Sequence, residues 1–205
     1  MSRLARCGIV FSCVLILATM AAAVKVGDPA PRFSAIDNHG KLQKLADYKG
    51  KYVVLEWHNQ GCPYTRKHYE SGNMQRLQKK WTGQGVIWFT VISSAPGTQG
   101  FVTPTQENEY LEKMHALPTA VLMDVTGTLG RLYDAKTTPD MYIIAPDGTL
   151  IYEGAIDDQP TTDKKHIAEA NNYVDAALTE VMAKKPVTVA ATRPYGCSVK
   201  YKNKF

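Results

Sequence analysis

Apolar and polar positions along the chain indicate several strands. Two near-continuous apolar runs, residues 52–57 and 86–92, have the length and the β-branched and aromatic content of buried strands. The runs 141–145 and 150–153 flank Asp147-Gly148, a dipeptide typical of a tight hairpin turn. With a shorter strand at 119–123, these runs predict a sheet that contains one clear hairpin.

Helical patterns occupy the segments between these strands. Residues 63–81 favour a helix, with a break at 71–73 where Ser, Gly and Asn follow one another. Residues 106–116 predict a short helix, and the prolines and glycines of 93–105 predict a long irregular connection before it. Residues 166–184 predict a final amphipathic helix with one apolar side, formed by Ile167, Ala170, Val174, Ala177, Leu178 and Val181. This order of elements predicts an α/β sandwich with a mixed sheet.

The first 23 residues have the pattern of a signal peptide. Arg3 and Arg6 precede an apolar run at 9–17, and the small residues 21–23 form a cleavage site. The apolar run is too short to cross a bilayer. We therefore expect an exported protein, periplasmic or secreted, without stable membrane contact after cleavage. An uncleaved N-terminal anchor is the alternative.

Removal of this leader changes the charge of the protein. The whole chain has 24 Lys and Arg against 19 Asp and Glu, a formal net charge of +5. Without the two leader arginines, 22 bases remain against 19 acids, or +3. These bases form no block of five or six, so the composition indicates no nucleic-acid partner.

Cleavage also halves the number of cysteines. Cys7 and Cys13 leave with the leader, and Cys62 and Cys197 remain. We expect one domain over residues 24–185 and a C-terminal tail, 186–205, that carries Cys197. Two cysteines are too few for a disulfide scaffold, so the pair is either one structural bridge or a redox couple.

Cys62 stands where a buried strand ends and a helix begins. The free N–H groups and the dipole of a helix start favour a thiolate, and Pro63 suits the first helical position. Arg66, Lys67 and His68 follow within two turns. We expect all of these features to lower the pKa of Cys62 below the usual value of about 8.5 and so to make it a nucleophile. An inert, buried thiol is the alternative.

The same residues resemble the active-site turn of the thioredoxin fold. That turn has a strand ending in tryptophan, here Trp57, followed by Gly61-Cys62-Pro63-Tyr64 at a helix start. Thr138-Pro139 resembles the cis-proline loop of that fold, and residues 26–33 are similar to the start of peroxiredoxins and alkyl hydroperoxide reductases. Further matching segments are 127–133, 146–148 and 151–154. The chain thus resembles the peroxiredoxin-like redoxins of the AhpC/TSA family, which implies a thioredoxin-like three-layer α/β/α sandwich around a central mixed sheet.

The sequence also departs from the patterns of these families. Thioredoxins have a second cysteine three residues after the first, and here that position is Thr65. Peroxiredoxins have threonine three residues before their reactive cysteine, and here that position is Asn59. Cys197 is therefore the candidate resolving cysteine. A permanent bridge to Cys62, pairing with another subunit and a free thiol are the other possibilities.

We therefore expect a thiol-dependent oxidoreductase that uses Cys62 for thiol–disulfide exchange or for peroxide reduction. Its partners would be a protein disulfide or a peroxide, together with a thiol reductant, and no cofactor is expected. The resemblance and the position of Cys62 suggest that Tyr64, Arg66, Thr138 and Pro139 bind the substrate. The alternative is a non-catalytic binding module of the same fold, for example one that binds copper through Cys62 and nearby histidines.

Overall fold

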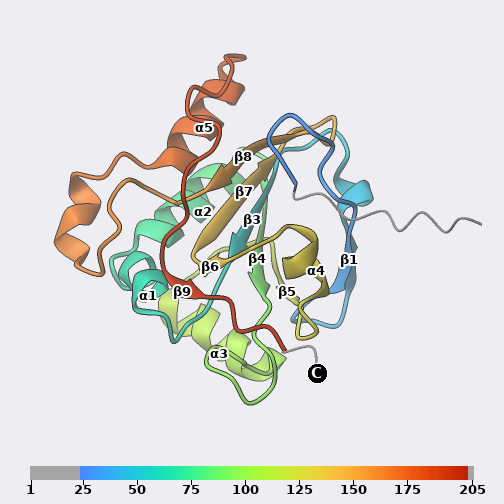
Figure 1. Ribbon diagram of the computed structural model, residues 1–205, viewed down its shortest axis with the longest axis vertical. Helices are drawn as coiled ribbons and strands as arrows, with labels where there is room; N and C mark the ends of the chain where they lie inside the picture. The colour runs from blue at the N-terminus through green and yellow to red at the C-terminus, as the bar shows by residue number, and fades with distance from the viewer. Residues whose placement is uncertain (1–23, 203–205) are drawn as a thin grey trace, which may run out of the picture.

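Five strands form the central sheet of the protein in the order β5–β4–β3–β7–β8 (Figure 1). The computed structural model describes residues 24–202, so the predicted leader lies outside the described residues. β3 is parallel to β4, and β4 to β5, whereas β7 is antiparallel to β3 and to β8, so the sheet is mixed as predicted. The five strands are β3 (Val53–Trp57), β4 (Ile87–Ile92), β5 (Ala120–Met123), β7 (Asp140–Ile144) and β8 (Leu150–Gly154).

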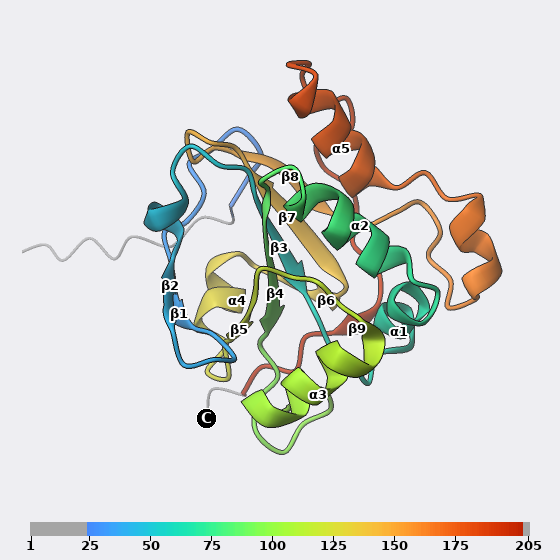
Figure 2. The ribbon, with the colours of Figure 1, turned by 180° about the vertical axis from the view of Figure 1, so that it is seen from behind.

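Helices cover both faces of this sheet, which confirms the three-layer arrangement. Figure 2 shows α1, α2 and α3 on one side, and α4 with the β1–β2 hairpin on the other. Alternate side chains of each strand reach opposite faces: Val54 packs in the cluster of α2 and α5, and Leu55 in the cluster on the α4 side. The helices are α1 (Pro63–Glu70), α2 (Asn73–Thr82), α3 (Pro104–Met114), α4 (Thr128–Leu132) and α5 (Tyr173–Met182). The remaining elements on these faces are β1 (Ser34–Ile36), β2 (Leu42–Lys44) and the 3-10 helices η1 (Leu45–Tyr48) and η2 (Lys164–Ala168).

The predicted break between the first two helices is present. α1 ends at Glu70, and Gly72 takes a left-handed conformation with φ of +72° before α2 begins. α3 starts two residues earlier than predicted, because Thr103 and Gln106 form a capping box and Pro104 occupies the first turn. Before it, residues 93–103 form the irregular connection that the sequence predicts.

The prediction of one continuous helix over residues 166–184 is wrong. The segment is divided into η2 and α5, with residues 169–172 between them. α5 begins where the Asn172 side chain accepts a hydrogen bond of 2.8 Å from the Asp175 backbone N–H. Ile167 and Ala170 therefore lie outside α5, and its buried side is formed by Val174, Ala177 and Leu178.

The C-terminal tail contains a strand that its sequence does not indicate. β9 (Cys197–Ser198) pairs antiparallel with β6 (Thr137–Thr138), which directly precedes β7. Further along, the Ala95 N–H donates to the Lys200 carbonyl, 2.8 Å away. The tail thus crosses the end of the sheet at which α1 starts (Figure 1).

Within residues 24–202, the helices are too short or too polar to cross a membrane.

Candidate functional site

Cys62 is the N-cap residue of α1. Its backbone is extended, with φ of −82° and ψ of 123°, and Pro63 follows in the first turn. The Cys62 N–H donates to the Asn59 carbonyl at 2.9 Å, and the Cys62 carbonyl accepts from the Arg66 N–H at 2.9 Å. The strand–loop–helix geometry expected from the sequence is therefore present, and it places the buried thiol at the positive end of the helix.

The loop before β7 lies against this thiol. The Thr138–Pro139 peptide bond is cis, as the resemblance implies. The Cys62 thiol donates to the Thr138 carbonyl, with Sγ and the oxygen 3.0 Å apart. Register explains the approach, because Trp57 at the end of β3 pairs with Asp140 at the start of β7.

The tail brings the second cysteine to the same place. In the β6–β9 pair, Cys197 is the register partner of Thr138, whose hydroxyl lies 3.4 Å from the Cys197 carbonyl. A Cβ on Gly196 would lie 2.1 Å from the Thr138 oxygen, so only glycine allows this approach. Within residues 24–202 neither cysteine forms a disulfide, and the two thiols lie close enough to shift the pKa of each other.

Hydrogen bonding makes the two thiols unequal. Burial alone would raise the pKa of Cys62, but hydrogen bonds from the Cys197 side chain, the Thr65 backbone and the Thr138 hydroxyl lower it below its ordinary value. The pKa of Cys197 is raised to about 11 by burial and by the neighbouring Cys62. Cys62 is thus the thiol that ionises first, and Cys197 remains its hydrogen-bond donor.

The bases after Cys62 are not among the main causes of this lowered pKa, contrary to the sequence prediction. The Arg66 guanidinium forms an exposed ion pair of 2.7 Å with Glu70. Lys67 and His68 are buried and face the tail, and desolvation lowers the pKa of His68 to about 3, so its ring is neutral. The hydrogen bonds described above lower the pKa of Cys62 instead.

Of the other predicted substrate residues, Tyr64 lies beneath the tail. Its ring is half-buried and meets that of Tyr195 edge to face, with centroids 5.8 Å apart. Arg66 lies at the exposed surface of α1, whereas Thr138 and Pro139 are buried beside Cys62. A role of these four residues in substrate binding stays a prediction.

A second group of polar residues, which the sequence analysis missed, is buried behind β3. We call Glu56, His58, Tyr69, Glu107 and Tyr110 the buried acid cluster. The Glu56 carboxylate accepts from the Tyr69 hydroxyl at 2.8 Å and lies 3.8 Å from the His58 ring nitrogen. Glu107 is completely buried, and neither of its oxygens has a hydrogen-bond partner within residues 24–202. Glu56 stands out in the sequence as an acid within the apolar run 52–57. Nothing in the sequence indicates that Glu107 lies near Glu56.

The histidines near Cys62 have other neighbours. The His68 ring contacts Asn73 and Tyr195 through its two nitrogens, and the His58 ring packs against Tyr69 and Tyr110. Over the described range 24–202, no three His, Cys, Asp or Glu side chains are grouped so that they could hold a metal ion. The geometry therefore lends no support to the copper-binding alternative.

Comparison with known proteins relates the chain to thiol-based redox proteins. The model of the AhpC/TSA family matches residues 26–153. The thiol-disulfide oxidoreductase ResA of Bacillus subtilis is 24% identical over 129 residues, which cover 63% of this chain and 66% of ResA. The peroxiredoxin Bcp of the same organism is 23% identical over 168 residues, which cover 72% of this chain and 92% of Bcp. The chain thus spans about two thirds of ResA and most of Bcp.

Solved structures show the same fold. A conserved protein of Geobacillus kaustophilus superimposes with a TM-score of 0.75 and 24% identity, covering 91% of this chain and 96% of that one. A thiol:disulfide interchange protein from Bacteroides sp. gives a TM-score of 0.51 at 19% identity, covering 71% and 88%. The architecture is therefore thioredoxin-like, as the resemblance implies.

Proposed function

The chain belongs to the AhpC/TSA family, a family of thiol-dependent oxidoreductases, and we propose that it is a thiol–disulfide oxidoreductase whose redox couple is Cys62 and Cys197 of one chain. The observation that carries this proposal is the β6–β9 pairing. It places Cys197 opposite Thr138, the residue whose carbonyl accepts the hydrogen bond from Cys62. The tail thus supplies the second thiol that is missing at Thr65.

The two thiols act in a fixed order in this proposal. Cys62 has the lowered pKa, so its thiolate attacks first, because only a thiolate attacks a disulfide sulfur. Cys197 has a pKa of about 11 and stays protonated until Cys62 has reacted. Loss of the negative charge on Cys62 then removes one of the causes that raise the pKa of Cys197.

The electrons balance in two exchange steps. The Cys62 thiolate attacks one sulfur of a protein disulfide, forms a mixed disulfide and releases the first partner thiolate, which takes up a proton. Cys197 then loses its proton and attacks Cys62 Sγ, which forms the Cys62–Cys197 disulfide and releases the second partner thiol. The partner disulfide gains two electrons, this protein loses two, and a thiol reductant restores the reduced pair.

The surroundings of Cys62 provide a surface for such a partner. Thr138 and Pro139 form the wall of the site next to the thiol, and Tyr64 and Arg66 lie on the first turn of α1. We propose that these four residues contact the partner chain. Access requires local movement of the tail, because Cys62 is completely buried in the reduced protein.

Asn59 favours disulfide exchange over peroxide reduction. It occupies the position of the peroxiredoxin threonine, but its side-chain oxygen accepts from the Gly61 N–H at 2.8 Å. Its amide nitrogen donates to the Gln99 carbonyl at 3.4 Å. The side chain thus holds the loop before Cys62 and is not free to orient a peroxide.

We also propose that the protein is exported, which the signal-peptide pattern of residues 1–23 supports. An oxidising compartment outside the cytoplasm supplies disulfides as substrates. N-terminal sequencing of the protein recovered from cell fractions tests this. A mature chain that starts near Val24 outside the cytoplasm is the expected result, and a full-length cytoplasmic chain contradicts it.

The redox proposal is tested by trapping the intermediates. Reduced protein is mixed with a peptide disulfide, quenched with acid and alkylated, and its cysteines are mapped by mass spectrometry. The wild-type chain should form the Cys62–Cys197 disulfide, Cys197→Ala should stop at a mixed disulfide on Cys62, and Cys62→Ala should not react. A parallel reaction with hydrogen peroxide serves as the comparison. Faster oxidation by peroxide than by the disulfide, or a wild-type chain without the internal disulfide, would overturn the proposal.

A further inference from the structure

Lys67 is an unusual residue for the interior of a protein. It lies on α1, five residues after Cys62, and only 1% of its surface is exposed. Burial of an ammonium group is unfavourable unless the charge is paired and hydrogen-bonded. Desolvation lowers the pKa of Lys67, and the nearby Asp157 carboxylate opposes that shift. The groups that pair with the Lys67 ammonium therefore indicate the structural role of this buried side chain.

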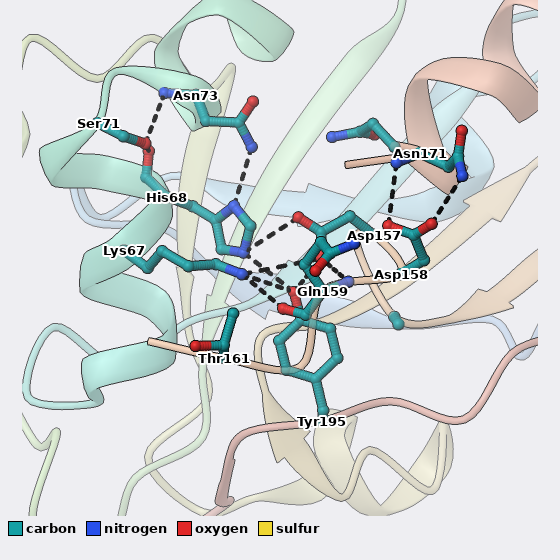
Figure 3. A network of polar contacts seen from close by, with 12 residues as sticks. Lys67, His68, Ser71, Asn73, Asp157, Asp158, Gln159, Thr161, Asn171 and Tyr195 are labelled. Carbon is teal, nitrogen blue, oxygen red and sulfur yellow. Dashed lines mark hydrogen bonds and ion pairs between the residues drawn. The ribbon is translucent and has the colours of Figure 1, made fainter. Parts of the chain in front are cut away.

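These partners come from the C-terminal tail and from the segment after β8 (Figure 3). The Lys67 ammonium donates to the Gln159 carbonyl at 2.7 Å and to the Tyr195 hydroxyl at 3.3 Å. It also lies 3.8 Å from the Asp157 carboxylate, which accepts a short hydrogen bond from Tyr195. The hydroxyl of Tyr195 is thus the point at which three separate parts of the chain meet.

Every hydrogen-bonding position of that hydroxyl is used. A phenol oxygen donates one hydrogen bond and accepts two. Tyr195 donates to Asp157, and it accepts from Lys67 and from the His68 Nε2, which is 3.3 Å away. Asn73 donates to the His68 Nδ1 at 2.9 Å, which places the ring proton of neutral His68 on Nε2. The network therefore holds the tyrosine in one position.

Tyr195 is directly connected to the second cysteine. Two residues of chain span at most about 7 Å, so a fixed Tyr195 limits where Cys197 can lie. Gly196 joins them with φ of +134°, a conformation that only glycine adopts readily. Cys197 itself is held by the β6–β9 strand pairing, in which Thr138 is its register partner.

We propose that Lys67, Asp157 and Tyr195 are positioning residues, a tail clamp that holds Cys197 within reach of Cys62. This inference rests on the proposed function. The clamp connects the tail to α1, the same helix whose start carries Cys62, so both thiols share one rigid support. The attack of Cys197 on Cys62 should therefore depend on the Tyr195 hydroxyl, although that hydroxyl does not take part in the chemistry.

A two-step thiol reaction separates positioning from chemistry. With Ellman's reagent as the probe disulfide, Cys62 attacks first and releases one thionitrobenzoate, which leaves the second one bound to Cys62. Cys197 then gives up its proton, attacks Cys62 Sγ and releases the second thionitrobenzoate. Stopped-flow absorbance records the two releases as separate phases, so that each cysteine has its own rate.

Tyr195→Phe removes the hydroxyl and keeps the ring. We expect the second phase to become at least tenfold slower, while the first phase is unchanged or faster, because access to the buried Cys62 requires movement of the tail that the clamp holds. Tyr173→Phe is the matched control, because Tyr173 lines the same cavity of about 620 Å³ beside Tyr195. The control should leave both phases unchanged. A second phase in Tyr195→Phe as fast as in the wild type would overturn the clamp.

A second variant tests the clamp independently, from the side of its charge pair. Asp157→Asn keeps an oxygen that accepts from Tyr195 but loses the charge that pairs with Lys67, and it should also slow the second phase. An unchanged second phase in this variant likewise overturns the clamp. Failure of the proposed function has a different signature, since the wild-type chain would then release only one thionitrobenzoate.

Discussion

The tail clamp and the buried acid cluster both include residues of α1, but they differ in how completely their hydrogen-bonding groups are paired. In the tail clamp, the ammonium of Lys67 faces the carboxylate of Asp157, and Tyr195 uses every hydrogen-bonding position of its hydroxyl. In the buried acid cluster, several polar atoms have no hydrogen-bond partner in the part of the chain that the structure describes: both ring nitrogens of His58, both oxygens of Glu107 and the Tyr110 hydroxyl. Because satisfied networks fix a geometry and unsatisfied groups are costly, the first group is suited to positioning.

Charge distinguishes the two groups as well. The clamp pairs one cation with one anion, whereas the acid cluster brings two carboxylates to one histidine. Burial raises the pKa of Glu107 to about 7, against the lowering effect of His58. The pKa of His58 is raised by Glu56 and Glu107, although burial opposes this. The acid cluster therefore changes its protonation near neutral pH.

The largest expected effect follows from breaking the charge pair of the clamp. Lys67→Met leaves Asp157 buried without its cation, which typically destabilises a protein by about 3–5 kcal/mol. Lys80→Met is the control, because the Lys80 ammonium pairs with Asp175 at 2.7 Å but is 44% exposed. Its loss should cost about 1 kcal/mol or less. Urea unfolding of both variants measures the difference, and equally small losses would contradict the role assigned to Lys67.

The next effect concerns the acid cluster and its dependence on pH. The pKa of Glu107 rises from an ordinary 4.5 to about 7 on folding, so the folded protein keeps a proton that the unfolded chain releases. The stability that this proton provides is complete below pH 4.5 and is lost as the pH rises towards 7, a change of roughly 3 kcal/mol. Glu107→Gln should abolish that part of the decline, which unfolding at a series of pH values from 4 to 8 would reveal.

Glu70 provides a control, because its contribution to stability should depend on pH in the opposite direction from that of Glu107. The pKa of the Glu70 carboxylate is lowered by its hydrogen bonds from Lys164 and Arg66. The contribution of Glu70 is therefore present above pH 4.5 and is lost as the pH falls, so Glu70→Gln should weaken the protein slightly at neutral pH. Parallel pH profiles for wild type and Glu107→Gln would show that Glu107 does not hold the extra proton.

A smaller effect should appear at Cys62 itself. Cys197→Ala removes the hydrogen bond to the thiolate, and a hydrogen bond to a charged group is worth about 1.5–3 kcal/mol. The pKa of Cys62 should therefore rise, which the ultraviolet absorbance of the thiolate measures against pH. Cys197→Ser retains a donor and should keep part of the lowering. A larger rise from Glu107→Gln than from Cys197→Ala would mean that the acid cluster, not the tail, controls the nucleophile.

Local features of the sequence were sufficient to predict the sheet and the position of Cys62. Apolar runs mark β3 and β4, and Pro63 after a strand marks the helix start. The tail could not be predicted in this way, because β9 is two residues long and is held by backbone pairing with β6, far away in the chain. Within the tail, Gly196 was the only residue whose type indicated that the backbone could come close to another part of the chain.

The wrong prediction for the bases near Cys62 has a geometric reason. Nearness in sequence suggested that Arg66, Lys67 and His68 act on the thiol, but α1 directs each of them to other partners. Arg66 pairs with Glu70 one turn further along, and Lys67 and His68 face Tyr195. Which face of a helix meets the tail is a tertiary property, and the tail had no predicted position.

The smallest expected effect is that of Tyr110→Phe, and its comparison with Tyr69→Phe distinguishes the unsatisfied members of the acid cluster from the satisfied ones. Tyr69 and Tyr110 have ring centroids 5.6 Å apart, yet only the Tyr69 hydroxyl reaches Glu56, at 2.8 Å. Tyr69→Phe removes a hydrogen bond to a charged group and should cost about 1.5–3 kcal/mol. Tyr110→Phe removes only an unpaired buried hydroxyl, so the free energy of unfolding should change by less than about 0.5 kcal/mol or increase slightly. Urea unfolding of the two variants compares them directly. A loss in Tyr110→Phe as large as in Tyr69→Phe would mean that the Tyr110 hydroxyl is hydrogen-bonded in solution and does not belong to the unsatisfied members of the cluster.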